Sequence, residues 1–317
     1  MSTPTTTRDP GAGLAASRVK LGEFQYEIGP LGHLAVERER LMAINWRAFE
    51  AQAVSATIGA EITGISLADD LPDATIAELR RALLDHKVLF FRNQPLTAGQ
   101  HVAFARRFGE LEVHPFITAN DEFPELVRFA KSADVGGYEN GWHSDVSWRA
   151  VPSMAAVLHA IAVPPTGGDT LFADMCAAYD GLPDDLKARI DPLVAVHDHV
   201  SSFGLGVPPE QRAEIRAKYP PVEHPVVRTH PETGRKLIYV NRFFTSHIVG
   251  LDPAESRELI ETLSRRADIV EYQCRFRWAP DSVAMWDNRA VQHYACSDYW
   301  PSVRVMERAS VIGDVPR

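Results

Sequence analysis

The stretch SVAMWDNRAVQHYACSDYWPSVRVMERASVIG, residues 282–313, contains two short apolar runs, SVAMW and VRVMERASVIG, with a polar and aromatic connection between them. Similar runs, such as MAAVLHAI (154–161) and KLIYVN (236–241), alternate with Pro- and Gly-containing connections through most of the chain beyond Gly109. Short strands at this spacing are typical of a β-sandwich or barrel, whereas alternating βαβ units would form a parallel sheet. We therefore predict a mainly β fold with flanking helices (α+β), a sandwich or jelly roll.

The residues before Gly109 predict elements that flank this β structure. In order, they are a hairpin over 54–67, a helix over 73–86 with Asp73 at its N-cap, a buried strand over 87–91, and a helix that begins with a capping box at Thr97 and Gln100. Helical patterns return at about 176–190 and 253–267. The Thr- and Pro-rich start has the composition of a mobile tail. We expect residues 1–45 to form a partly disordered N-terminal extension and residues 46–317 to form one domain.

Composition excludes several classes of protein. With 317 residues and 45% hydrophobic residues, the chain can bury a large core. Its formal net charge of -9 argues against nucleic acid or an anionic membrane as partner, because both favour a basic surface. The three cysteines lack any C-x-x-C spacing, so we predict neither a disulfide framework nor a zinc ribbon. The sequence shows neither a membrane span nor a secretory signal, so we expect a cytoplasmic protein.

One short motif offers metal-binding chemistry. In NGWHSDVSW (140–148), His143 and Asp145 are two residues apart, so both can point to the same side of an extended segment. His293 lies next to another strand-like run about 150 residues later. Two imidazoles and one carboxylate match the facial triad that binds non-haem Fe(II) and leaves coordination positions open. A structural zinc site would use four closing ligands, usually with thiolates.

The sequence resembles the taurine dioxygenase family of Fe(II)- and 2-oxoglutarate-dependent dioxygenases. The resemblance covers about residues 52–317 and is carried, in the family's order, by the motifs WHSD, TGGDTLF, HPVVRTHPETGRK, WDNRAVQHYACSDY and RVMERASVIGD. It implies a double-stranded β-helix fold and the cofactors Fe(II), 2-oxoglutarate and O2. It also implies that His143, Asp145 and His293 are the iron ligands at the catalytic centre. Halogenating relatives lack the carboxylate, so Asp145 favours hydroxylation or a related oxidation.

An arginine suits the far carboxylate of 2-oxoglutarate, because a guanidinium binds a carboxylate through two hydrogen bonds and stays charged when buried. Arg304 and Arg308 are both candidates, and their spacing of four places them on one face of a strand. The resemblance assigns the 2-oxoglutarate carboxylate to Arg304, with the hydroxyl of Thr170. It assigns an anionic group of the substrate to Arg308.

The resemblance also implies which positions contact the substrate: His114, Ile117, Glu139, Val146, Phe203, Phe244 and Arg308. Two of them depart from the taurine enzyme, where Ile117 is a tyrosine and Glu139 an asparagine. Asn140 is adjacent, so a shift of one residue would restore the asparagine. His114 and Arg308 together suit an anionic head such as a sulfonate, sulfate or carboxylate. We therefore expect an anionic substrate that need not be taurine.

The predicted function is oxidation of a C–H bond of a small anionic organic molecule, with release of succinate and CO2. Two alternatives remain at this point: a non-catalytic metal- and 2-oxoglutarate-binding sensor of the same fold, and a jelly-roll interaction protein in which the three ligands are coincidental. Arg304 and Thr170 count against a protein that only binds a metal, since such a protein needs no 2-oxoglutarate site. By analogy with the family we expect a homo-oligomer, a dimer or tetramer.

Overall fold

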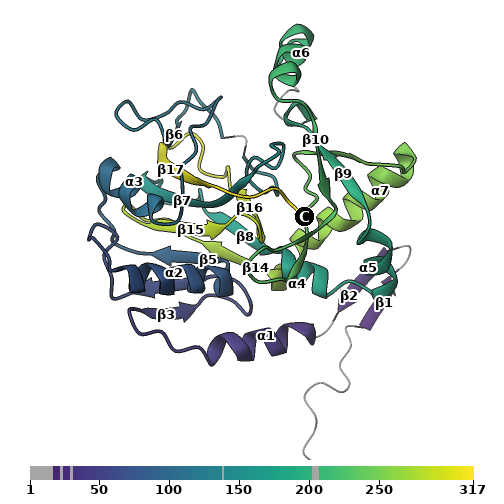
Figure 1. Ribbon diagram of the computed structural model, residues 1–317, viewed down its shortest axis with the longest axis horizontal. Helices are drawn as coiled ribbons and strands as arrows, with labels where there is room; N and C mark the ends of the chain where they lie inside the picture. Colours follow the sequence, from purple (N-terminus) through teal and green to yellow (C-terminus); the bar gives the residue numbers. More distant parts are fainter. Residues whose placement is uncertain (1–16, 22–23, 29–30, 138, 202–206) are drawn as a thin grey trace, which may run out of the picture.

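The structure is a computed structural model that describes residues 17–21, 24–28, 31–137, 139–201 and 207–317. The predicted mobile tail falls almost wholly outside these ranges, as does Phe203. Figure 1 shows strands at the centre of the molecule and most helices around them. Among the described residues, no helix is both long and apolar enough to cross a membrane.

Two facing sheets form the centre of the fold. The larger sheet has seven strands in the order β3 (Glu50–Ala53), β4 (Ala60–Thr63), β5 (Val88–Phe91), β15 (Val283–Asp287), β7 (Ser153–Ala162), β17 (Arg304–Ile312) and β6 (Leu126–Lys131). The smaller sheet has the order β14 (Gln273–Phe276), β8 (Thr170–Asp174) and β16 (Val291–Ala295). All neighbours are antiparallel except β4 and β5. The jelly roll expected from the sequence is confirmed.

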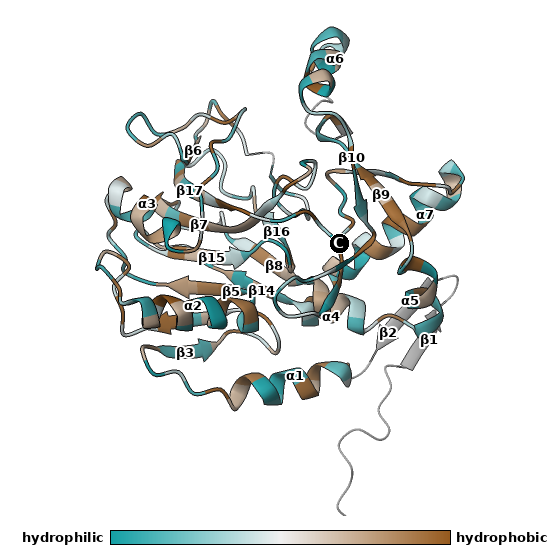
Figure 2. Cartoon of the chain, in the orientation of Figure 1, coloured by the Kyte–Doolittle hydropathy of each residue, from teal (hydrophilic) through white to brown (hydrophobic). Residues whose placement is uncertain are grey.

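The core between the two sheets is aromatic and aliphatic. Phe90 from the larger sheet stacks on Phe276 of the smaller one, with ring centroids 4.2 Å apart. Phe172 and Trp286 belong to the same buried cluster. β5 reads VLFF and is buried along its whole length, as a strand covered on both faces must be, and Figure 2 shows it as an apolar strand.

The remaining strands form smaller sheets. They are β10 (Val222–Pro225), β9 (Val194–His197) and β13 (Thr245–Ile248) in one sheet, β11 (Val227–Thr229) with β12 (Lys236–Ile238), and β1 (Ser17–Leu21) with β2 (Phe24–Ile28). The helices are α1 (His33–Met42), α2 (Asp73–His86), α3 (Ala98–Arg106), α4 (Met175–Asp180), α5 (Asp184–Ile190), α6 (Pro209–Lys218) and α7 (Pro253–Ser264), with short 3-10 turns at His199–Ser201, Arg265–Asp268 and Val270–Tyr272. α6 buries no residue and projects from the body in Figure 1.

Local sequence signals explain several boundaries. α3 begins with the predicted capping box, in which the Thr97 hydroxyl accepts the Gln100 N–H and the Gln100 side chain accepts the Thr97 N–H. α2 covers the predicted range, but the predicted N-cap is wrong. Pro72 occupies that position and the Asp73 carboxylate instead accepts a hydrogen bond from Arg107. The predicted hairpin is present, with its first strand four residues earlier than expected, in β3.

Candidate metal centre and substrate cavity

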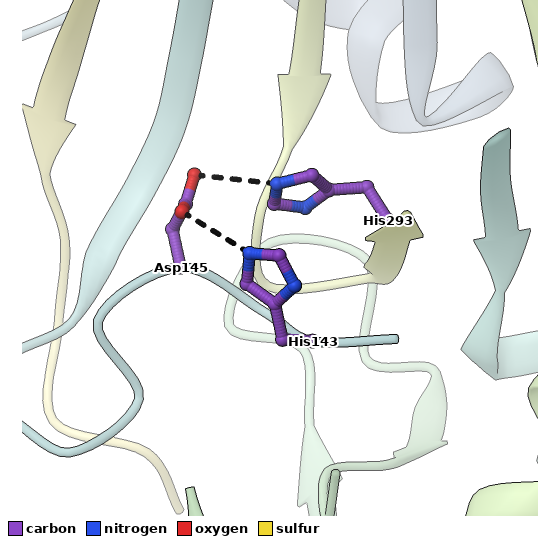
Figure 3. A group of neighbouring side chains, drawn as sticks. All are labelled: His143, Asp145 and His293. Atoms are coloured by element: carbon purple, nitrogen blue, oxygen red, sulfur yellow. Dashed lines mark ion pairs between the residues drawn. The ribbon is translucent and has the colours of Figure 1, made fainter. Parts of the chain in front are cut away.

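The three predicted metal ligands lie together. His143 and His293 exchange two backbone hydrogen bonds in an isolated antiparallel bridge, N···O 3.1 and 2.8 Å, and Asp145 begins the turn that follows. His143 Nε2 is 3.8 Å from Asp145 Oδ1, and His293 Nε2 is 3.9 Å from Asp145 Oδ2 (Figure 3). Two atoms that bind one ion at about 2.1 Å lie at most about 4.2 Å apart. One ligand atom from each of the three side chains lies within 4.8 Å of the other two, so the group could hold a metal ion.

The two imidazoles have the orientation and protonation state that metal ligands need. His143 Nδ1 donates to the Gly141 carbonyl at 2.8 Å, so its Nε2 lone pair is available for a metal. Phe243 stacks on the His143 ring at 5.0 Å, and a Cβ at Gly141 would lie 2.1 Å from Phe243, so this packing requires glycine. Burial lowers the pKa of His143, and it lowers that of His293 to about 3. Both rings are thus neutral at physiological pH, as metal ligation requires.

The Asp145 carboxylate is ionised although it is buried. Burial alone would raise its pKa, but the guanidinium of Arg308 and the two imidazoles outweigh burial and lower the pKa to about 2. Arg308 Nη1 donates to both carboxylate oxygens at 2.8 Å. The sequence did not indicate this pairing. It places the arginine predicted to bind the substrate directly beside a predicted metal ligand.

Arg304 and Thr170 form a polar corner of the same site. Arg304 is 7% exposed, its Nε donates to the Gly168 carbonyl at 3.2 Å, and no carboxylate of the described residues lies within ion-pair distance of it. Gly167 and Gly168 have φ of 77° and 70°, in the region that favours glycine, and a Cβ at Gly168 would lie 3.2 Å from Arg304 Cδ, so the backbone passes close to the arginine side chain. The Thr170 hydroxyl accepts the Trp278 indole N–H at 3.0 Å, which leaves its own O–H to donate. A buried unpaired cation beside a free hydroxyl donor suits a carboxylate ligand.

His114 is fixed as a neutral hydrogen-bond donor. Its Nδ1 accepts the backbone N–H groups of Phe116 and Ile117, both at 3.2 Å, so the ring hydrogen is on Nε2. Burial, with the positive charge of Arg308, lowers the pKa of His114 to about 4. At neutral pH the ring can therefore donate one hydrogen bond to a bound group without carrying charge.

One cavity of about 520 Å³ joins these groups. It is lined by the three metal-ligand candidates and by every other predicted site residue that the structure describes: His114, Ile117, Glu139, Val146, Thr170, Phe244, Arg304 and Arg308. Glu139 forms an ion pair with Lys131 at 3.0 Å, and Lys131 also lines the cavity. The predicted roles of these residues remain predictions, but the structure brings them to one space.

The cavity has two walls of different character. The metal-binding wall is defined by His143, Asp145, His293, Thr170, Arg304 and Arg308. The aromatic wall is defined by Phe116, Ile117, Trp148, His199, Val207 and Ile215. In the aromatic wall Phe116 stacks on His199 at 4.7 Å, and Trp148 meets the His199 ring edge-on at 4.9 Å. Three chain segments far apart in sequence supply these rings.

Sequence reasoning missed most of the aromatic wall. His199 belongs to HDH (197–199), which resembles a metal motif, yet the group of possible ligands found among the described residues is the triad alone. His197 instead lies within hydrogen-bond distance of Ser147. No spacing signal links residues 116, 148 and 199, because they meet only through the tertiary fold.

Comparisons with known proteins agree with this geometry. The family model described as "Taurine catabolism dioxygenase TauD, TfdA family" matches residues 50–310. An alkylsulfatase from Acinetobacter baylyi is 36% identical over 84% of this chain and 86% of its own length. An (S)-phenoxypropionate/alpha-ketoglutarate dioxygenase from Sphingobium herbicidovorans is 37% identical over 84% of this chain and 96% of its own. The crystal structure of a taurine dioxygenase from Burkholderia xenovorans has a TM-score of 0.75 and 38% identity, and covers 85% of this chain and 91% of its own.

Proposed function

Because the chain belongs to the TauD/TfdA family of dioxygenases, we propose that it oxidises a C–H bond of a small anionic organic molecule, such as a sulfonate, sulfate ester or carboxylate. The reaction class itself follows from the family and the triad: the protein is a 2-oxoglutarate-dependent non-haem iron dioxygenase that uses Fe(II), 2-oxoglutarate and O2. Bound iron and 2-oxoglutarate supply the oxidising chemistry, with succinate and CO2 as co-products. The substrate class and the role of each residue belong to the proposal.

His143, Asp145 and His293 would hold the iron on one side, so that the other positions stay open to ligands. The neutral imidazoles and the ionised carboxylate are already in the protonation states that ligation needs. The backbone bridge between His143 and His293 fixes the separation of the two rings. The protein contributes orientation and burial at this point.

Arg304 and Thr170 would bind the far carboxylate of 2-oxoglutarate. The support is the buried guanidinium, which has no acidic partner among the described residues, and the Thr170 O–H that Trp278 leaves free. A buried cation without a partner is costly, and an incoming carboxylate removes that cost. Charge-assisted bonds to a carboxylate would also orient the keto-acid end toward the metal ligands.

The observation that carries the substrate proposal is the pair of donors His114 and Arg308 at one cavity with the metal ligands. His114 offers a fixed Nε2–H, and Arg308 contributes a positive charge next to Asp145. An anionic head held there would place the neighbouring carbon atoms beside the metal. Ile117, Val146 and Phe244 give the rest of the site an apolar surface that suits a hydrocarbon body.

We further propose that residues 46–317 are one catalytic domain with 1–45 as an extension, that the protein is a homo-oligomer, and that it works in the cytoplasm. α1 supports a docked role for part of the extension. Its Glu37 pairs with Arg235 at 2.8 Å and lies 3.8 Å from the buried Lys87. The net charge of -9 supports a partner set of small molecules.

The test is a screen for substrate-dependent succinate release with sulfonates, sulfate esters, aryloxy acids and amino acids. Each anionic compound is paired with a neutral analogue of the same body, for example an alkyl sulfate with the corresponding alcohol. We expect release with anionic members and little with their neutral partners. Equal release, or equal binding of charged and neutral analogues, would remove the anionic head from the proposal.

A further inference from the structure

The turn after Asp145 contains a strained residue. Val146 has φ of 47°, in the left-handed region that β-branched L-residues avoid. Of the other described non-glycine residues with positive φ, Asn93 and Asp281 are of types that tolerate this region, and Lys87 ends a helix. Val146 lines the cavity and directly follows a metal-ligand candidate. Backbone strain of this kind persists only where surrounding contacts hold it.

Asn288 supplies those contacts. Its Oδ1 accepts the Asp145 N–H at 2.7 Å, and its Nδ2 donates to the Asp145 carbonyl at 3.0 Å. The same Nδ2 donates to the Ser153 carbonyl in β7, also at 3.0 Å. A carboxamide is suited to this task because it carries a donor and an acceptor on one planar group. Both backbone polar groups of Asp145 are thus bound to a single side chain that is 1% exposed.

The turn that carries Asn288 is itself firmly held. The Asn288 N–H donates to the Met154 carbonyl at 2.8 Å, and the Asp287 N–H donates to the Lys87 carbonyl at 2.8 Å. The buried Asp287 carboxylate accepts hydrogen bonds from Arg289 at 2.9 and 2.7 Å and lies 3.0 Å from His230 Nε2. Asn288 is therefore anchored to the larger sheet rather than to the loop that it binds.

The residues after the strained position are fixed as well. Ser147 is fully buried, and its Oγ accepts the Asn241 amide at 3.0 Å and lies 3.0 Å from His197 Nδ1. On the other side, the Ser144 hydroxyl donates to the Val291 carbonyl in β16 at 2.8 Å. The strain at Val146 is confined between these two attachments, and Asn288 is the contact that sets the peptide groups of Asp145.

We propose that Asn288 is a positioning residue that maintains the left-handed turn at Val146, and so sets the Asp145 carboxylate toward the metal and the Val146 side chain into the cavity. The inference rests on the proposed metal-binding role of Asp145. It does not depend on which substrate is oxidised. Without Asn288, the turn would relax toward the β region that valine prefers, and Asp145 would leave its place opposite His143 and His293.

The chain offers a matched control in Gln94. This buried amide also joins separate backbone segments, because its Oε1 accepts the Leu67 N–H at 2.7 Å and its Nε2 donates to the Arg92 carbonyl at 3.0 Å. Gln94 does not line the cavity. Gln94→Ala therefore reports the cost of losing a buried cross-linking amide away from the metal centre.

The experiment measures Mn(II) affinity by calorimetry in the full chain, without 2-oxoglutarate or substrate. We expect Asn288→Ala to weaken Mn(II) binding roughly 10- to 100-fold, and Gln94→Ala to change it less than about twofold. In the Asn288→Ala background, Val146→Gly should recover much of the lost affinity, because glycine adopts the left-handed turn without strain. Equal losses in the Asn288 and Gln94 variants, or unchanged affinity in Asn288→Ala, would overturn the proposal.

A second measurement tests the strained turn at Val146 and can be made even if Asn288→Ala does not fold. The thermal unfolding midpoints of Val146→Gly and Val146→Ala are compared in the otherwise unchanged chain. We expect the glycine variant to be the more stable, the reverse of the usual order, because only alanine retains the left-handed strain. A higher unfolding midpoint for Val146→Ala than for Val146→Gly would contradict the claim that the turn is strained, and with it the proposal. Failure of wild-type protein to bind Mn(II) would overturn the metal site beneath the proposal, whereas failure of the substrate proposal appears only in the succinate screen.

Discussion

The two walls of the cavity are held by different kinds of interaction. The metal-binding wall is buried, with no residue more than 7% exposed, and it is fixed by strand pairing and directional hydrogen bonds such as those of Asn288 and Trp278. The aromatic wall relies on ring contacts, and its Phe116 is 42% exposed. Ring packing tolerates replacement better than a hydrogen-bonded ligand set does. From this comparison we propose that the first wall sets the reaction and binds the anionic head of the substrate through Arg308, and that the second wall contacts the body of the substrate.

The largest predicted effect is a difference in activity between two alanine variants, each of which replaces a buried aspartate that pairs with an arginine. Asp145→Ala should abolish 2-oxoglutarate-dependent succinate formation, a loss of more than about 100-fold, because it removes a metal ligand. Asp198, which precedes His199 of the aromatic wall and pairs with Arg216 at 2.6 Å, is the matched residue. Asp198→Ala should retain metal binding and most of the maximal rate. Assays of succinate formation with saturating substrate measure the rates of both variants. Comparable activity in the two would contradict the division into two walls.

The sequence predicted the metal-binding wall far better than the aromatic wall, for physical reasons. His143 and Asp145 are two residues apart, and His293 lies in a motif next to a strand. Short segments of sequence are therefore enough to predict these three ligands. The ion pair of Asp145 with Arg308 could not be predicted, because it depends on how the turn meets β17. The N-cap at Asp73 was mispredicted since Arg107, distant in sequence, binds that carboxylate.

The next effect tests the proposed binding of 2-oxoglutarate by Arg304 and Thr170. Arg304→Met should raise the KM for 2-oxoglutarate roughly 10- to 100-fold, the equivalent of losing charge-assisted hydrogen bonds worth about 1.5–3 kcal/mol. Thr170→Val should raise it less, about 3- to 10-fold, because one neutral hydrogen bond is lost. Mn(II) affinity should stay unchanged in both variants. Steady-state kinetics with varied 2-oxoglutarate measure the effect, and a larger change in Thr170→Val than in Arg304→Met would reverse the assigned roles.

A smaller effect is expected from the aromatic wall. Phe116→Ala should raise the KM for the primary substrate roughly 3- to 10-fold, because part of the apolar contact area is lost while the ring is already half exposed. The KM for 2-oxoglutarate should not change. Ile117→Tyr serves as a companion variant that adds a polar group and should alter substrate preference rather than the maximal rate. A change in 2-oxoglutarate KM in either variant would show that the walls are not independent.

The last prediction concerns His114, which also lines the cavity, and it is measured on stability rather than on kinetics. Its pKa is lowered from 6.5 to about 4, chiefly by burial, so from pH 6.5 down to 4 the unfolded chain binds a proton that the folded chain does not. Folding stability should therefore fall as the pH is lowered through this range, by up to about 1.4 kcal/mol per pH unit from this group. His114→Gln should flatten the slope by that amount. Urea unfolding at pH 7, 6 and 5 checks it, and parallel slopes in both proteins would place His114 in contact with solvent.

The most direct test of the two-wall account is anaerobic absorption spectroscopy with Fe(II) and 2-oxoglutarate. In this account a weak visible charge-transfer band requires the three proposed metal ligands and the proposed 2-oxoglutarate site at Arg304 and Thr170, and it needs neither substrate nor the aromatic wall. The account predicts the band in the wild-type protein and in Phe116→Ala, and its absence in folded Asp145→Ala. A folded wild-type protein without the band, or a band lost in Phe116→Ala and kept in Asp145→Ala, would contradict the account.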